Sequence, residues 1–222
     1  MMRKWFALCS GLVLTLMLSA LALISATPAK AYTFAIGGGW EVVVDDAWYD
    51  LGLIDLVTDA VNADSVEIQK AGEYLANVPL ILTFNQVAAN AVHDIIINDE
   101  ILTNSTGTDW TAFVMELLDD GDAVFDPVAS AGLSIDPFTV ATFDLGDSRF
   151  TVSGGVVPDG ATWSPGSSPF DGELVINTTL GAGTAQDPYT TFSLKEYPVP
   201  EPNTLALVAL GLVGLALRQR RA

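Results

Sequence analysis

The chain has 222 residues, and its formal net charge is −18 at pH 7. The acidic charge is concentrated in residues 32–198, where 26 acidic residues stand against three basic ones, Lys70, Arg149 and Lys195. Nucleic acid and anionic membrane surfaces repel such a segment, so both are excluded as its partners. The segment has the length of one ordinary domain, and its charge either attracts cations or simply keeps its surface soluble.

The N-terminal segment, residues 1–31, has the composition of a secretory signal peptide. A positive start precedes an almost wholly apolar run over residues 5–24. Small residues then frame a cleavage site, which includes Ala29 and which we predict to lie directly after Ala31. An uncleaved N-terminal anchor is the alternative, because the apolar run is long for a signal peptide.

Cleavage at this position removes Cys9, which is the only cysteine of the chain. The exported domain, residues 32–198, then holds neither a disulfide nor a reactive thiol. A secreted domain without disulfides needs a hydrophobic core of its own, and this length is sufficient to build one.

Short apolar, β-branched runs alternate with clusters of Gly, Pro, Asp and Asn throughout residues 32–198. The runs predict β-strands, and the clusters predict turns about every ten residues. This pattern indicates an all-β fold, an antiparallel β-sandwich of the jelly-roll or immunoglobulin-like type. The predicted strands are 32–36, 40–44, 48–57, 64–70, 79–86, 94–102, 110–118, 138–143, 149–153, 172–178 and 189–196.

Three of these segments differ in their hydrophobic pattern. In 64–70, apolar residues alternate with polar ones, which predicts a half-buried strand. In 94–102, three consecutive isoleucines predict a buried central strand, and the polar residues 98–100 are expected to form a polar face near its end. The segment 48–57 fits neither period, so a strand is predicted there with a short helix as the alternative.

The domain offers few of the residues that catalysis requires. Its single histidine, His93, precedes an apolar strand, where a strand-end role is the ordinary one. The sequence contains no Gly-x-Ser-x-Gly or His-Glu-x-x-His motif and no glycine-rich loop that opens a helix. We therefore expect a non-enzymatic protein with no catalytic and no cofactor-binding residue. A carboxyl pair for glycoside cleavage is the alternative, because aspartates are frequent.

Two acidic turns are the candidates for binding calcium, which takes six to eight oxygen ligands. The side chains concerned are Asp119, Asp120, Asp122, Asp144 and Asp147. Neither turn has the spacing of an EF-hand loop. Turn aspartates exposed to water are the simpler interpretation, so no metal site is predicted, and calcium binding is the alternative.

The C-terminal segment, residues 199–222, has three parts in a fixed order. The first part is the short motif Val199, Pro200, Glu201 and Pro202. Its prolines fix φ and lack a backbone donor, and each pushes the preceding residue to extended geometry. We expect the motif to be stiff, exposed and extended, a shape that the cleft of a processing enzyme is able to grip.

The second part is an apolar run over residues 204–217, which in lipid has to be helical. Its residues reach about 21 Å as a helix, short of the roughly 30 Å hydrocarbon core, and snorkelling arginines with local thinning close the gap. The third part, the basic tail 218–221, contains Arg218, Arg220 and Arg221, which the positive-inside rule places in the cytoplasm. An ordinary C-terminal membrane anchor is the alternative.

The motif, the short apolar helix and the terminal arginines together resemble the PEP-CTERM sorting signal. Pro200, Glu201 and Pro202 match the motif that gives this family its name, and the resemblance is confined to residues 199–222. It implies recognition by a membrane protease of the exosortase type, which cuts near the Pro-Glu-Pro motif and hands the protein to the cell surface. It also implies a Gram-negative source that makes exopolysaccharide.

We therefore predict a secreted, non-enzymatic surface or extracellular-matrix protein that is associated with exopolysaccharide in a biofilm. Its expected partners are an exosortase-type protease, the inner membrane through the C-terminal helix, and exopolysaccharide. We expect transient anchoring with the domain in the periplasm, followed by transfer to the cell surface or matrix. The alternative is a carbohydrate- or calcium-binding adhesin domain, for which Trp163 in the loop 158–169 is the candidate sugar contact.

Overall fold

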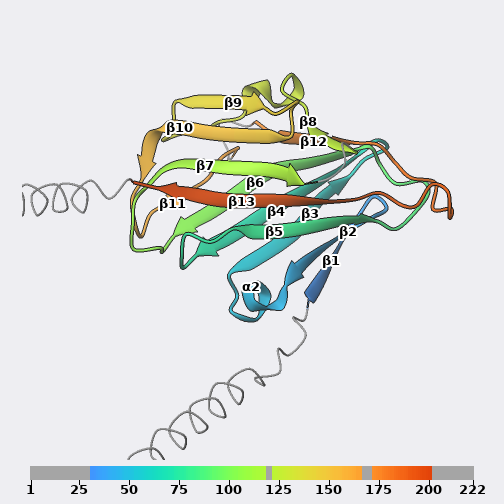
Figure 1. Ribbon diagram of the computed structural model, residues 1–222, viewed down its shortest axis with the longest axis horizontal. Helices are drawn as coiled ribbons and strands as arrows, with labels where there is room; N and C mark the ends of the chain where they lie inside the picture. Colours follow the sequence, from blue (N-terminus) through green and yellow to red (C-terminus); the bar gives the residue numbers. More distant parts are fainter. Residues whose placement is uncertain (1–30, 119–121, 167–171, 202–222) are drawn as a thin grey trace, which may run out of the picture. The chain divides into compact units, whose positions relative to one another are not determined.

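The computed structural model of the chain describes residues 31–118, 122–166 and 172–201 (Figure 1). The predicted signal peptide up to Lys30, the predicted transmembrane helix 204–217 and the basic tail lie outside these residues. Within the described part, no helix combines the length and the apolar character needed to cross a membrane.

The first of two sheets has seven strands in the order β1-β2-β5-β13-β7-β10-β9. Strand β13 lies in its middle, between β5 and β7, and runs the length of the sheet (Figure 1). In chain order the strands are β1 (Ala31–Gly37), β2 (Trp40–Asp45), β5 (Leu80–Gln86), β7 (Trp110–Leu118), β9 (Val140–Asp144), β10 (Arg149–Val157) and β13 (Thr191–Pro200).

The second sheet has six strands, with the order β3-β4-β6-β12-β8 and with β11 added against β6. Its strands are β3 (Ile54–Val61), β4 (Ser65–Tyr74), β6 (Asp94–Asn104), β8 (Ala123–Phe125), β11 (Thr162–Trp163) and β12 (Leu174–Thr178). The described residues also contain two short helical segments, α2 (Asp46–Asp50) and the 3-10 helix η1 (Ala129–Gly132).

The predicted all-β sandwich is confirmed, but one strand pair is not antiparallel. Strands β4 and β6 run parallel, whereas the other paired strands of the described residues are antiparallel. The chain leaves β4, contributes β5 to the other sheet and only then returns as β6. Such a crossover brings the returning strand in with the direction of the strand it left.

The segment 48–57 contains both of the structures considered for it. Helix α2 ends at Asp50, and strand β3 begins at Ile54. The Asp45 side chain accepts a hydrogen bond from the backbone N–H of Ala47 at 2.8 Å, which caps the first turn of the helix. The mixed pattern therefore reflects two elements in one stretch.

Aromatic contacts join the two sheets in the core. Tyr74 of β4 packs edge-on against Trp110 and Phe113 of β7, with ring centroids 5.5 and 5.7 Å apart. Phe84 of β5 stacks on Phe192 of β13 at 4.9 Å within the seven-stranded sheet. Such contacts add directional packing to the burial of apolar surface that holds a sandwich together.

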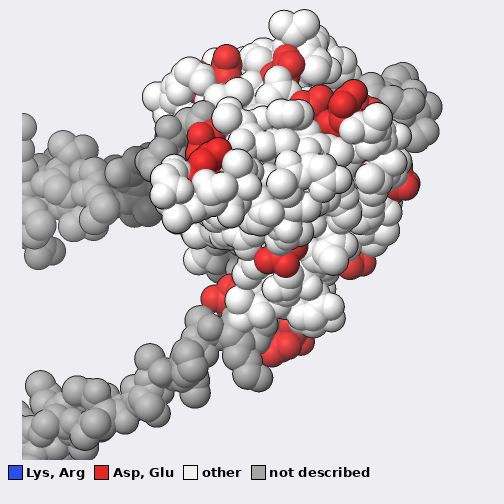
Figure 2. Space-filling model, turned by 90° about the vertical axis from the view of Figure 1, so that its right-hand side faces the viewer, with Lys and Arg blue, Asp and Glu red and all other residues white. Residues whose placement is uncertain are grey.

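Apart from the buried Glu100 and Glu196, the acidic residues whose burial the structure describes are exposed or half-buried. Figure 2 shows acidic side chains at scattered positions on one face, with no basic side chain of the described residues in view. Charge distributed in this way opposes self-association and the approach of anionic surfaces.

Asn104 holds the turn that leads from β6 to β7. Its side chain is fully buried, and its Nδ2 donates to the carbonyl oxygens of Thr108 at 2.9 Å and Val157 at 3.0 Å. Its Oδ1 accepts from the backbone N–H of Thr106 at 3.1 Å and from the Thr106 hydroxyl at 2.8 Å. One amide therefore replaces the backbone pairing that the turn cannot make.

We expect Asn104→Ala to lower the free energy of unfolding by about 2–3 kcal/mol, because it leaves the buried Val157 carbonyl and the half-buried Thr106 groups without their partner. Asn77→Ala is the matched control, since the Asn77 side chain is exposed and donates only to the Thr108 hydroxyl at 3.0 Å. The control should stay within about 0.5 kcal/mol of the parent. Urea unfolding followed by tryptophan fluorescence measures both, and equal losses would contradict this role of Asn104.

Candidate functional site: the end of strand β13 and the buried charges beside it

Strand β13 is the element that leads into the C-terminal segment. Its side chains alternate, with Phe192, Leu194, Glu196 and Pro198 buried and the residues between them exposed or half-buried. It pairs with β5 from Thr191 to Glu196 and with β7 from Ser193 to Pro200, so it is bonded on both sides between Ser193 and Glu196. The strand predicted here from the sequence ended at Glu196, four residues before the observed end at Pro200.

The first two residues of the proline motif belong to β13. Val199 pairs with Ala112 and Pro200 with Trp110 of β7. The Thr111 hydroxyl donates to the Val199 carbonyl at 3.3 Å. Pairing with β5 has already ended at this point, which leaves Pro198 and Pro200 in a stretch of β13 bonded on one side only.

The expectation of an exposed motif is therefore wrong for Val199 and Pro200, which are half-buried, although their extended geometry is as expected. Glu201 is exposed, and its backbone N–H donates to the Asp109 carbonyl at 3.0 Å. Pro202 lies outside the described residues. The sheet thus holds the chain up to the middle of the motif.

Three charged side chains meet in the interior between the sheets: Lys70 from β4, Glu100 from β6 and Glu196 from β13. Their exposed fractions are 1%, 3% and 0%. The Lys70 ammonium donates to Glu100 Oε1 and, at 2.5 Å, to Glu196 Oε2. These contacts, which we call the buried triad, link the two sheets by charge as well as by packing.

A bulge places Glu100 in the triad. Up to Ile97 the inward positions of β6 are the odd-numbered ones, and the register with β4 then shifts at Asn98. Beyond the shift Glu100 points inward and is the direct partner of Lys70 across the parallel pair. The expectation that Glu100 forms part of a polar face is wrong, because the extra residue reverses the alternation.

The inward orientation of Lys70 could be predicted from the sequence pattern of β4. It continues the inward positions of Val66 and Ile68 on β4, where an alternating strand points its side chain into the core. The matching position of Glu100 had no such signal, because a bulge is not visible in the hydrophobic pattern.

The electrostatics of the triad are dominated by burial. Burial raises the pKa of Glu100, the charge of Lys70 opposes this and that of Glu196 adds to it, with a resulting pKa of about 7. Burial lowers the pKa of Lys70, but the neighbouring Glu100 and Glu196 more than offset it, so that this pKa is raised. Near neutral pH the lysine is therefore charged, and one carboxyl readily holds a proton.

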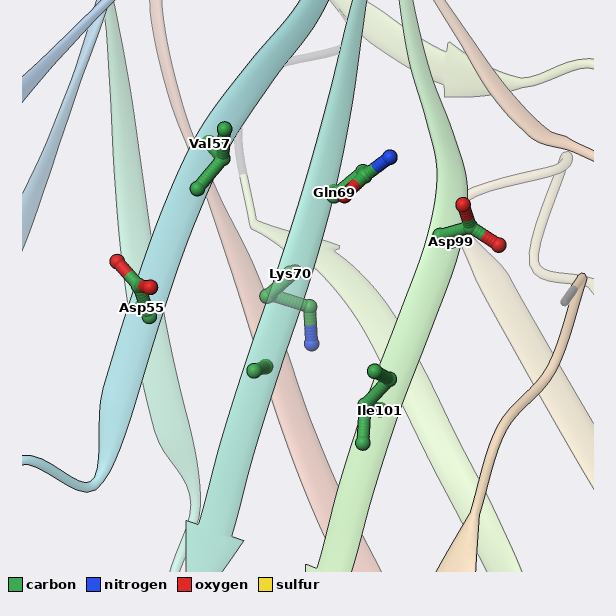
Figure 3. A pocket seen from close by; sticks show the side chains of 7 residues that line it. Asp55, Val57, Gln69, Lys70, Asp99 and Ile101 are labelled. Carbon is green, nitrogen blue, oxygen red and sulfur yellow. The ribbon is translucent and has the colours of Figure 1, made fainter.

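A hollow of about 310 Å³ lies on the outer face of the six-stranded sheet, which contributes Lys70 and Glu100 to the triad. Lys70 belongs to its wall, together with residues such as Asp55, Gln69 and Asp99 (Figure 3). In Figure 3 the Lys70 side chain runs behind its strand, away from the side on which Gln69 stands. The hollow therefore does not open onto the triad.

The candidate calcium ligands do not form a cluster in the described residues. Asp119 and Asp120 lie outside them, Asp122 is exposed, and Asp144 ends β9, three residues before Asp147 in the next turn. Within the described ranges, no group of three or more His, Cys, Asp or Glu is arranged to hold a metal ion.

Two further residues singled out in the sequence have structural positions. His93 lies directly before β6, is exposed, and contacts the Thr178 carbonyl through Nδ1 at 3.2 Å. Trp163 is 99% removed from solvent, and its ring packs 5.1 Å from those of Phe113 and Phe138. The hypothesis that Trp163 contacts a sugar is wrong, because its ring fills the core.

The described residues form an acidic β-sandwich, and its central strand β13 leads directly to the C-terminal segment. A family model described as the PEP-CTERM protein-sorting motif matches residues 198–221. The chain therefore carries this sorting motif, and the motif supports export and sorting by an exosortase-type protease to an extracellular location. No curated protein matches the chain.

We expect Lys70→Met to lower the free energy of unfolding by about 3–5 kcal/mol, because it leaves buried glutamates without their cation. Lys195→Met is the matched control. Lys195 is a partly exposed lysine of β13 that lies 3.7 Å from Glu116, and its loss should cost at most about 1 kcal/mol. Denaturant unfolding of both variants measures the difference. Equal losses would show that burial of the triad has no energetic consequence.

Proposed function

We propose that the protein is a non-enzymatic surface or extracellular-matrix component. It is exported, held at the inner membrane by its C-terminal segment, and processed there by an exosortase-type protease. The processed domain then joins the cell surface or an exopolysaccharide matrix. The match of the sorting motif to residues 198–221 is the observation that carries this proposal.

The absence of an enzymatic role is part of the proposal. Glu100 and Glu196, which both contact Lys70, lie in the interior at 3% and 0% exposure. A glycosidase needs its two carboxyl groups on either side of a bound sugar, in a site open to substrate. A sealed pair is unsuited to this chemistry.

The pairing of β13 with β7 limits where the protease is able to cut. A protease binds its substrate as an extended chain, and Val199 and Pro200 are already occupied in a sheet. Strand β13 ends at Pro200, and the exposed Glu201 is bonded to Asp109 only through its backbone N–H. We therefore place the cut on the C-terminal side of Pro200.

We expect the C-terminal tryptic peptide of the exported protein to begin at Glu196 and to end at Pro200 or beyond it. Trypsin cuts after Lys195, so this peptide carries the processed end and its mass gives the cut directly. A peptide that ends at Tyr197, Pro198 or Val199 would contradict the proposed limit, because it requires β13 to open before cleavage.

We expect the precursor to lose its membrane retention in a triple variant, because the positive-inside signal is removed. This variant combines Arg218→Ala, Arg220→Ala and Arg221→Ala. Gln219→Ala, an uncharged change within the same tail, is the control and should behave as the parent. Fractionation and immunoblotting in a host with an exosortase-type protease, and in the same host without it, follow retention and processing. A triple variant that is held and processed like the parent would refute the retention role.

Titration calorimetry of the exported protein tests the adhesin alternative against this proposal. We expect no heat of binding with calcium or with the host's exopolysaccharide beyond that of dilution. Saturable binding of either ligand would favour the adhesin function and would point to a surface other than Trp163.

A further inference from the structure

The buried triad brings an amine and two carboxyl groups together in a space closed to water. Lys70 contacts both glutamates, and the three side chains are between 0% and 3% exposed. Glu196 uses only one oxygen for this contact. Its Oε1 is buried and has no hydrogen-bond partner within the described residues.

If all three groups are charged, burying the triad is unfavourable in free energy. Two carboxylates and one ammonium leave a net negative charge in the core, and an unpaired carboxylate oxygen has given up its hydration without compensation. One proton on Glu100 removes the net charge, in keeping with the raised pKa of that group. It still leaves an ammonium and a carboxylate in a dry interior.

We propose that Lys70 and Glu100 condense to an amide, which forms an intramolecular cross-link between β4 and β6, with Glu196 as the proton carrier. The starting state is the ammonium of Lys70, the neutral carboxyl of Glu100 and the carboxylate of Glu196. The end state is a neutral amide, a neutral Glu196 and one released water. Condensation thereby removes the remaining pair of charges from the core.

The reaction needs no oxidant, metal or outside reactant. Glu196 takes a proton from the Lys70 ammonium, and the free amine attacks Cδ of the protonated Glu100 carboxyl. The new bond joins Nζ to Cδ, and the bond between Cδ and the Glu100 hydroxyl oxygen breaks. Glu196 returns its proton to the departing hydroxyl, which leaves as water, and accepts the second proton released by the nitrogen.

The positions of the two glutamates indicate that Glu100 forms the amide and that Glu196 carries the protons. Lys70 and Glu100 are direct register partners on neighbouring parallel strands, so the sheet itself holds the amine beside the carboxyl group. Fixed proximity of this kind replaces the encounter that makes amide formation slow in water. Glu196 approaches from the facing sheet at 2.5 Å and keeps a free oxygen, which suits it to move protons.

Such a cross-link would serve a domain whose predicted mature form has no cysteine. It closes a loop between two core strands, as a disulfide would, but its bond is insensitive to reducing conditions. The inference does not rest on the proposed sorting function, since the triad lies in the domain and not in the tail.

Tryptic digestion of the purified, denatured full chain tests the cross-link, because trypsin does not cut after an amidated lysine. We expect no cut at Lys70 and a single fragment that ends at Arg149, lighter than its sequence by one water. The cut after Lys195, the other lysine of the domain, must be complete and is the internal control. Separate peptides, one ending at Lys70 and the other spanning 71–149, would overturn the proposal.

The same digest distinguishes the acceptor. An amide to Glu196 would attach the fragment that begins at Glu196, and this outcome would overturn the assignment of Glu100. We expect Glu100→Leu to restore the cut at Lys70, and Glu196→Gln to reduce the cross-linked fraction at least tenfold at equal folding time. Circular dichroism checks that both variants fold. Full cross-linking in Glu196→Gln would refute the proton-carrying role, and the parent digest decides the cross-link without either variant.

Discussion

The pairing of β13 with β5 and β7 is the constraint on which the other features depend. This strand crosses the centre of the seven-stranded sheet, places Phe192 and Leu194 in the core, and supplies Glu196 to the buried triad. The same strand continues to Val199 and Pro200, with a shift in its register against β7 between these two residues. The sorting segment therefore begins inside the folded domain, so that folding of the sheet determines how much of the motif a protease is able to reach.

The buried triad sets a second constraint, because charges in a dry interior have to be compensated. Lys70 and Glu100 face each other within one sheet, and Glu196 comes from the other. Their contacts tie the relative position of the sheets to that of three side chains. A core that relied on apolar packing alone would tolerate small shifts between sheets more readily than one that has to keep a lysine paired.

Much of the fold was predictable because the strands follow the alternation of apolar and polar residues. Leu80, Leu82 and Phe84 lie on one face of β5 as their spacing indicates, and the turn predicted around Asp144 and Asp147 joins β9 to β10. The parallel pairing of β4 with β6 was not predictable in this way, because it depends on a crossover through the other sheet. The burial of Trp163 was also not predictable, because it depends on a distant strand. The short strand β11, which lies in a Pro-rich loop, pairs with β6 and buries the ring.

The sequence by itself determined the all-β class, the acidic surface and the proline motif at the start of the sorting segment, because each depends on local composition or order of residues. The tertiary structure alone decided that half of this motif is locked in a sheet and that Glu100 turns inward to meet Lys70 and Glu196. Both outcomes depend on strand register and on a bulge, and these are set by partners far away in the chain, which no local pattern records.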